Sequence, residues 1–352
     1  MRTAPFLIAC CAAFPAQAQT AAMTLTVPPA IAAEYVRPHV LIDIGAGRKL
    51  NLFCMGQGNR TVIFDAGGSD WSVIWALVQP GVAPRARACS YDRAGMGYSD
   101  PSDEPRSPIA IVEDLHKLIR AAKIDTPLVF VGHSLGGFNV KLYAALYPED
   151  VAGLVLVDPA EDRGFVRTRD ALRAKFGTAL AVKLELISLT GRPRTVSHYD
   201  DCAAAARVHD LDPASDIYKN CTDPTNPSLG PKIAAERQKI QVKRAYQDAQ
   251  ASEIANSVYD DLRSDDAYAK LFSGPALGDK PLIVLTHSIY DPNDPVSAAS
   301  FFVWNSTHEQ TAALSTRGFN RIVPDTHHDI EIDHPQAVID AVTEVLNDIG
   351  PK

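Results

Sequence analysis

The sequence has no excess of positive charge. Its 34 Lys and Arg residues are outnumbered by 42 Asp and Glu residues, which gives a formal net charge of -8 at pH 7. Proteins that bind nucleic acid normally carry a strongly basic surface, so no nucleic-acid partner is expected. The chain has 352 residues, of which 46% are hydrophobic and 22% charged, and these values are typical of a globular enzyme.

Long hydrophobic runs are also missing. The N-terminus has Arg2, an apolar stretch over residues 4–14 and then Ala16-Gln17-Ala18, which fits the small-residue cleavage site of a secretory signal peptide. That stretch is too short to span a bilayer, and no later one reaches about 18 uninterrupted apolar residues. We therefore predict a signal peptide over residues 1–18 and a periplasmic or secreted protein without stable membrane insertion. Lipidation at Cys10 is an alternative, disfavoured because only six residues precede the Leu7-Ile8-Ala9-Cys10 motif.

Cysteine is scarce, and no C-x-x-C spacing occurs among the six present, which argues against a zinc site. Removal of the signal peptide leaves four. An oxidising compartment allows disulfides to persist, so we predict that these four are paired. The economical pairing is Cys54 with Cys89 and Cys202 with Cys221. Four unpaired thiols would be favoured only if the protein is not exported.

Short apolar segments alternate with amphipathic helical patterns along most of the chain. The predicted strands cover residues 40–44, 50–54, 62–64, 88–91, 128–131, 153–157, 282–286 and 321–323. Among the helices, Ser107 and Pro108 mark the start of one, and another begins near Pro335. This alternation predicts an α/β fold with a mostly parallel eight-stranded sheet and helices on both faces.

One long interval, residues 161–278, contains no convincing strand and several charged helical stretches such as residues 234–251. We predict that it forms a helical cap inserted after the sixth strand. The core would then comprise residues 19–160 and 279–352.

A nucleophile elbow is the clearest functional motif. The pentapeptide Gly132-His133-Ser134-Leu135-Gly136 stands between an apolar strand and a helical pattern, which is the context that such an elbow requires. Glycines two residues before and after Ser134 avoid clashes with the adjacent strand and helix. Ser134 is therefore the candidate nucleophile.

Together with its neighbours, this motif resembles the α/β-hydrolase superfamily, and most closely its serine esterases and lipases. The matching segments are Asp65-Ala66-Gly67-Gly68, residues 91–100, Gly132-His133-Ser134-Leu135-Gly136-Gly137 and Thr326-His327-His328-Asp329-Ile330. The resemblance implies that the second and fourth strands are neighbours, so that Cys54 would face Cys89. Within residues 91–100, Asp92 and Arg93 are expected to form a buried structural turn beneath the site.

A serine hydroxyl needs a base and a carboxylate that orients that base. His328 matches the family's histidine, between the last strand and the last helix. For the acid, Asp291 follows the seventh strand, where most members carry it, but the usual preceding glycine is missing. Asp158 ends the sixth strand, where some relatives carry the acid, and we favour Asp158 with Asp291 as the alternative. Asp294 is a third possibility.

The resemblance also implies an oxyanion hole formed by the backbone N–H groups of Gly68 and Leu135. Family members usually have His-Gly where this sequence has Ala66-Gly67, so the supporting hydrogen bond of that histidine is missing. A metal site in the His-rich segment 327–334 is disfavoured because its histidines lack helical i,i+4 spacing. No metal or other cofactor is predicted.

These features predict an exported serine hydrolase that cleaves a small-molecule carboxylic ester through an acyl-enzyme intermediate. An amide or peptide hydrolase of aminopeptidase type is the alternative, and acidic cap residues that bind a free amine would favour it. A binding protein that kept the fold and lost the chemistry is a further, weaker alternative.

Overall fold

The computed structural model describes residues 25–258 and 266–350. The predicted signal peptide and the alternative lipidation site at Cys10 lie outside the described residues. The strands are β1 Val40–Asp43, β2 Lys49–Met55, β3 Thr61–Asp65, β4 Arg87–Tyr91, β5 Leu128–His133, β6 Val151–Val157, β7 Leu282–Thr286 and β8 Gly318–Ile322.

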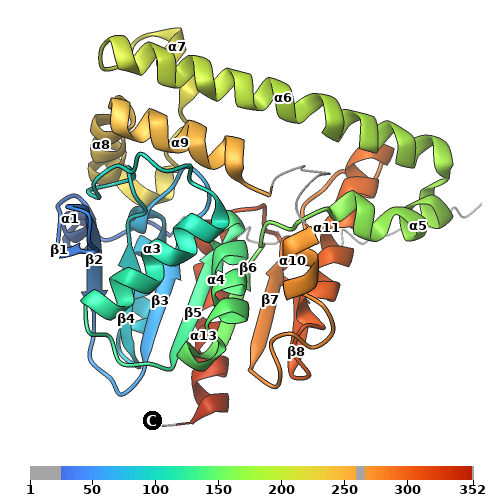
Figure 1. Cartoon of the computed structure of the whole chain (residues 1–352), viewed down its shortest axis with the longest axis horizontal. Helices are drawn as coiled ribbons and strands as arrows, with labels where there is room; N and C mark the ends of the chain where they lie inside the picture. Colours follow the sequence, from blue (N-terminus) through green and yellow to red (C-terminus); the bar gives the residue numbers. More distant parts are fainter. Residues whose placement is uncertain (1–24, 259–265, 351–352) are drawn as a thin grey trace, which may run out of the picture.

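These strands form one eight-stranded sheet in the order β1-β2-β4-β3-β5-β6-β7-β8 (Figure 1). Pairing is antiparallel from β1 through β2 to β4 and parallel across the remaining strands. A tight turn at residues 45–47 joins β1 to β2, and the Arg48 N–H donates to the Gly45 carbonyl at 3.1 Å. The predicted mostly parallel α/β sheet is therefore confirmed.

Helices outside the predicted cap cover both faces of the sheet. They are α1 Pro29–Tyr35, η1 Ser72–Leu77, α2 Gln79–Val82, α3 Pro108–Ala121, α4 Ser134–Leu146, η2 Pro148–Asp150, α11 Pro295–Ala312, α12 Ile330–Asp333 and α13 Pro335–Ile349. As predicted, α3 begins after Ser107, whose hydroxyl accepts the Ala110 N–H, and α13 begins at Pro335.

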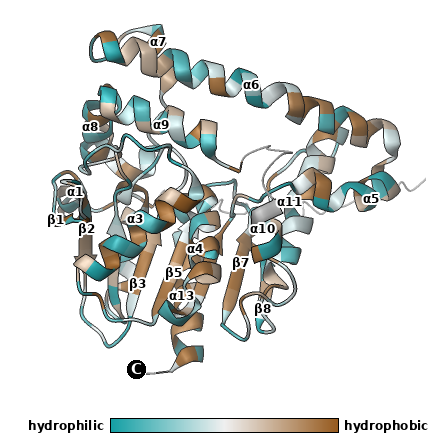
Figure 2. Ribbon diagram, in the orientation of Figure 1, coloured by the Kyte–Doolittle hydropathy of each residue, from teal (hydrophilic) through white to brown (hydrophobic). Residues whose placement is uncertain are grey.

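Alternate residues of each central strand enter two separate hydrophobic cores. In β5, Val129 and Val131 pack with α13, whereas Leu128 and Phe130 pack with α3 and α4. A strand whose both faces are buried is apolar at nearly every position. The strands β3, β5 and β7 are accordingly drawn in brown, the hydrophobic end of the scale in Figure 2.

Within residues 161–278, the described residues contain helices and no strand. The helices are α5 Gly164–Phe176, α6 Thr178–Val208, α7 Asp216–Cys221, η3 Pro227–Leu229, α8 Gly230–Gln241, α9 Arg244–Asn256 and α10 Asp266–Leu271. The predicted helical insertion after the sixth strand is thus present, and α6 crosses above α8 and α9 in Figure 1. The exact division into core and cap stays a prediction.

Two predicted elements have different bounds in the structure. The stretch 234–251 is two helices, because the chain leaves helical geometry at Lys243, which has a ψ of 144°. The last strand is Gly318–Ile322 rather than 321–323. This strand lies at the edge of the sheet, and its apolar Phe319 and Ile322 are separated by the polar Asn320 and Arg321, so its apolar signal is weak.

Both predicted disulfides are present. Cys54 on β2 and Cys89 on β4 are direct partners in the register, with Cα atoms 4.0 Å apart. Cys202 on α6 is bonded to Cys221 at the end of α7. Across the described ranges, no helix is both long enough and apolar enough to cross a membrane.

Candidate active site

Ser134 lies at the junction between β5 and α4, on a strained turn. Its φ of 49° lies in the left-handed region, which costs free energy for a residue with a side chain. A Cβ at Gly132 would come within 2.3 Å of the Gly136 carbonyl oxygen, and one at Gly136 within 2.3 Å of the Asp65 carbonyl oxygen. Both glycines are therefore required by close backbone approach, as the elbow motif predicts.

His328 lies in the loop between β8 and α12, and it contacts the residue before Ser134. The His133 Nε2–H donates to the His328 carbonyl oxygen at 3.1 Å, and the two imidazole centroids are 4.7 Å apart. Ser134 and His328 line the same cavity, which has a volume of about 320 Å³. The nucleophile and base candidates are therefore brought together from distant parts of the chain.

Asp158 follows β6 directly and faces His328. Its Oδ2 accepts a hydrogen bond from His328 Nδ1 at 2.6 Å. The same oxygen accepts from His287 Nδ1 at 2.8 Å, while Oδ1 accepts from the His287 backbone N–H and the Trp304 indole N–H, each at 3.0 Å. The Asp158 side chain is fully buried, and these four bonds fix both of its oxygens.

The electrostatics of this pair follow from those bonds. Burial alone would raise the pKa of Asp158, but the hydrogen bonds from His287 and His328 outweigh it and hold that pKa well below its usual range. Burial would lower the pKa of His328, but the Asp158 carboxylate outweighs it and raises that pKa above 6.5. Because Nδ1 donates to Asp158, Nε2 of a neutral His328 is free to accept a proton.

The alternative acids are occupied elsewhere. Asp291 is exposed in the loop after β7, and its Oδ1 accepts the Asn293 backbone N–H at 2.8 Å. Asp294 caps α11 by accepting the N–H groups of Val296 and Ser297. The structure thus places Asp158, and neither of these two residues, against His328.

The loop after β3, which carries Gly68, is held by a buried arginine. Arg93 donates to the carbonyl oxygens of Ala66 and Gly67, both at 2.6 Å, and forms ion pairs with Asp65 and Glu253. Arg93 is therefore part of a buried turn beneath the site, as predicted. The hydrogen bonds from Arg93 to the backbone hold this loop, in which Ala66 stands where family members usually have histidine.

Glu253 extends this support into the helical insertion. It lies on α9, and its Oε2 accepts the Ser69 backbone N–H at 3.2 Å, next to Gly68. From the same helix, the Tyr246 hydroxyl donates to the Ser69 carbonyl at 2.9 Å. Gly68 itself lines the cavity beside Ser134. The geometry of the loop thus depends on the insertion as well as on the sheet.

A second buried contact lies below the elbow. His133 Nδ1 is 3.0 Å from Glu331 Oε1, and both side chains are buried. Burial lowers the pKa of His133 to about 3, and burial together with Asp329 raises the pKa of Glu331 well above its usual value. Burial therefore favours the uncharged form of both groups, and His133 is too weak a base to compete with His328.

Two groups of side chains have the residue types and spacing of metal ligands, with ligand atoms within 4.8 Å of one another. They are Asp158, His287 and His328, and His133, Asp329 and Glu331. In the first group, hydrogen bonds already occupy both oxygens of Asp158. In the second, burial and Asp329 raise the pKa of the Glu331 carboxyl well above its usual value, which opposes the anionic form that binds a cation.

Sequence reasoning missed His287, Trp304 and Glu253. A signal existed for His287, because it follows β7 directly and β7 neighbours β6 in the sheet, so its backbone had to lie near Asp158. Trp304 on α11 and Glu253 on α9 reach the site from helices whose orientation toward the sheet is not encoded in their spacing.

Comparison with known proteins agrees with this architecture. A family model described as alpha/beta hydrolase fold matches residues 60–250. The chain is 33% identical over 105 residues to the uncharacterized protein YqjL of Bacillus subtilis, covering 30% of this chain and 42% of YqjL. It is 31% identical over 112 residues to the mouse (lyso)-N-acylphosphatidylethanolamine lipase, covering 29% of this chain and 31% of the lipase.

The fold extends beyond these local matches. The structure is similar to that of a thermophilic esterase from Thermogutta terrifontis, with a TM-score of 0.55, 17% identity and coverage of 89% of this chain and 99% of the esterase. The matched stretches span less than half of the curated relatives named above. The family model, by contrast, covers more than half of this chain and includes the Ser134 turn. The chain therefore belongs to the α/β-hydrolase fold family.

Proposed function

We propose that the protein is a serine hydrolase that cleaves carboxylic esters through an acyl-enzyme intermediate. The observation that carries the proposal is the placement of Ser134, on a strained turn, in one cavity with a histidine whose Nδ1 is bound to a buried carboxylate. This combination is typical of an activated serine nucleophile.

In the proposed reaction, the Ser134 hydroxyl oxygen attacks the ester carbonyl carbon while His328 Nε2 takes the hydroxyl proton. The Asp158 carboxylate stabilises the imidazolium that forms. Collapse of the tetrahedral intermediate breaks the bond to the alcohol oxygen, which receives the proton from His328. Water then attacks the acyl-enzyme with His328 again as base, and this step releases the carboxylic acid and restores Ser134.

The negative charge of the tetrahedral intermediate requires preset donors. We assign this role to the backbone N–H groups of Gly68 and Leu135. Leu135 lies in the first turn of α4, where backbone N–H groups have no partner within the helix. Gly68 belongs to the loop that Arg93 and Glu253 hold in place.

An amide or peptide hydrolase is the second candidate, and the acidic residues that line the cavity support it. Asp70, Asp223 and Asp329 line the cavity with Ser134, whereas Arg237, which pairs with Asp70, is its one lining Arg or Lys among the described residues. Asp223 comes from the insertion. Carboxylates in this position suit a substrate with a free amine, as an aminoacyl compound has.

A panel of chromogenic substrates separates these candidates. We expect p-nitrophenyl esters of some acyl length to be hydrolysed much faster than aminoacyl p-nitroanilides. Faster hydrolysis of the anilides would favour the amide or peptide hydrolase over the ester hydrolase. A fluorophosphonate probe should label Ser134, and no labelling together with no turnover would favour a non-catalytic binding protein.

We also propose that the protein is exported, on the basis of the N-terminal sequence and the two disulfides. Intact-mass measurement of protein recovered from the periplasm or the medium should give a chain that begins near Gln19. Alkylation without reductant should add no mass, because all four remaining cysteines are paired. Recovery of the unprocessed chain from the cytoplasm alone, or alkylation of these cysteines, would contradict export.

A further inference from the structure

Exposed apolar side chains gather on α5 and the first half of α6, which we call the α5–α6 face. They are Val166, Val182, Leu186, Ile187 and Leu189, with exposed fractions of 37%, 41%, 54%, 48% and 47%. Isolated exposed apolar residues are ordinary, but several on neighbouring turns form a patch that indicates a binding surface.

The pattern along α6 shows that this exposure is built into the helix. Ala181, Leu184 and Ser188 form its buried side. Val182, Leu186, Leu189 and the exposed Pro193 recur at intervals of four, three and four residues, which places them together on the opposite side. This part of α6 therefore has two apolar sides, of which only one is covered by the protein.

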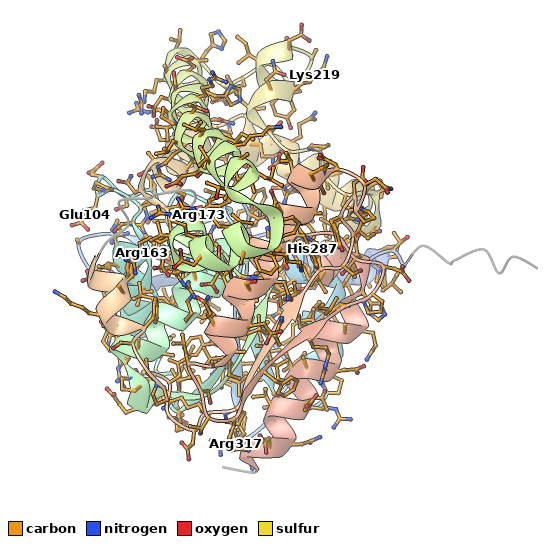
Figure 3. All side chains as sticks on the ribbon, turned by 90° about the vertical axis from the view of Figure 1, so that its right-hand side faces the viewer. Glu104, Arg163, Arg173, Lys219, His287 and Arg317 are labelled. Atoms are coloured by element: carbon orange, nitrogen blue, oxygen red, sulfur yellow. A yellow bond between two sulfur atoms is a disulfide. The ribbon has the colours of Figure 1, made fainter. Side chains whose placement is uncertain are left out.

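The same segment has a net positive charge. Residues 163–194 contain eight Arg or Lys and two Asp or Glu, whereas the whole chain has a net charge of -8. Three of these basic residues are paired: Arg163 with Asp162, Arg167 with Glu161, and Arg169 with Glu185. Arg173, Lys183 and Arg194 are exposed, and within residues 25–258 and 266–350 none of these three forms an ion pair. Figure 3 turns this side toward the viewer and labels Arg163 and Arg173.

We propose that the α5–α6 face docks on the surface of a lipid bilayer that contains anionic lipids. A bilayer interface offers an apolar layer beneath a plane of negative headgroups, so it can cover Leu186 and Leu189 and neutralise Lys183 and Arg194 together. Nucleic acid would leave the apolar residues uncovered. A symmetric second copy would bring two basic faces together, and like charges would oppose that contact.

The cavity beneath this face is consistent with a lipid partner. Ile187, exposed on α6, also lines a cavity of about 420 Å³ together with Phe165 and Val303, and the wall of this cavity also includes Glu161 and Arg163. Trp304 forms part of its wall and donates to Asp158. The docking face thus adjoins a cavity with both apolar and charged lining, and Trp304 separates this cavity from the Asp158 carboxylate.

Vesicle flotation with the purified protein tests the docking surface. We expect binding to phosphatidylcholine vesicles with about a third phosphatidylglycerol, weak binding to pure phosphatidylcholine, and loss of binding as salt concentration rises. Lys183→Glu with Arg194→Glu should weaken binding about tenfold or more. Leu186→Ser with Leu189→Ser should weaken it by a similar factor, because the apolar contact is lost.

Matched controls use exposed residues outside the face. Val208→Ser, at the other end of α6, and Lys232→Glu, on α8, should leave binding unchanged. Circular dichroism and thermal melting would show that each variant is folded. The measurement does not depend on catalysis, so its result is independent of the proposed ester hydrolysis.

Three outcomes would overturn the proposal. The first is no binding to anionic vesicles, or equal binding to both vesicle types. The second is a dimer, seen by analytical ultracentrifugation without lipid, that Leu186→Ser with Leu189→Ser dissociates. The third is binding to DNA in preference to vesicles, with the same dependence on Lys183 and Arg194.

Discussion

Two parts of the molecule differ in how far their side chains find partners within the chain. At the carboxyl edge of the sheet, Asp158 is fully buried, and both of its oxygens accept hydrogen bonds, from His287 just after β7, Trp304 on α11 and His328. On the α5–α6 face, Leu186 is 54% exposed, and Lys183 has no ion-pair partner among the described residues. The first arrangement fixes a geometry within the chain, whereas the second leaves apolar and basic side chains exposed, where the proposed bilayer would contact them.

The difference extends to how each part is held. The central strands bury both faces, whereas α6 has buried residues only near its ends, at positions 181–188 and 202–206. One end packs with α5 and α11, and the other is bonded through Cys202 to Cys221. The sheet edge therefore suits precise chemistry, and the insertion suits contact with a partner or a substrate.

The largest effect is expected at the sheet edge, from Ser134→Ala. Loss of a triad nucleophile lowers kcat by about 10⁶-fold, because acyl transfer to the enzyme is no longer available. The purified variant should keep its fold, since alanine fits the space of serine at this position. Hydrolysis of a p-nitrophenyl ester at more than about a hundredth of the wild-type rate would show that Ser134 is not the nucleophile.

The next effect separates the two acids. Asp158→Asn should lower the rate about 10⁴-fold, because the amide favours the wrong tautomer of His328. Asp291→Asn is the matched control and should change the rate little, since Asp291 is exposed and, in the part of the chain that the structure describes, bonds to its own loop and the start of α11. Both variants should be measured at saturating substrate. A large loss confined to Asp291→Asn would assign the acid to the loop after β7.

The sheet edge was largely predictable from the sequence, because its signals are local. Ser134 stands in a five-residue motif, and Asp158 ends an apolar strand that a parallel sheet must place near β5. Asp158 and Asp291 could not be separated with certainty, because that choice depends on how far each loop reaches. In the structure, Asp158 accepts four hydrogen bonds, two of them from the unpredicted His287, one from Trp304 and one from His328.

The insertion was predictable only as a helical segment. The break at residue 243 separates two stretches that share one helical pattern, and α6 continues past Gly191 and Pro193, which usually end a helix. Contacts with α5 and α9 hold this helix, and such contacts override local propensity. Its apolar positions lie on two sides, so the spacing alone does not tell which side is covered.

A pair of leucines on α6 sharpens the contrast between covered and uncovered sides. Leu184→Ala should lower the free energy of unfolding by about 2–4 kcal/mol, because Leu184 is 2% exposed and its loss leaves a cavity. Leu186→Ala, two residues away, should stay within about 0.5 kcal/mol of wild type. Chemical denaturation measures both. Similar losses for the two would mean that Leu186 is covered in solution.

The smallest effect concerns His287, which shares Asp158 Oδ2 with His328. His287→Phe keeps an aromatic ring but removes the side-chain donor, so more of the carboxylate charge is available to His328. The pKa of His328, already raised by Asp158, should rise further. Since His328 must be neutral to act as base, activity is lost as pH falls through this pKa. The acid limb of the kcat/KM profile should therefore move to higher pH.

The plateau rate of His287→Phe should fall by only about fivefold, the rate equivalent of about 1 kcal/mol for one hydrogen bond. Trp304→Phe is the matched control, because its indole N–H donates to Oδ1, the oxygen that His328 does not use. It should move the acid limb less than His287→Phe does. An acid limb that stays in place in His287→Phe, or moves to lower pH, would mean that His287 supports the fold of the β7 end without tuning the base.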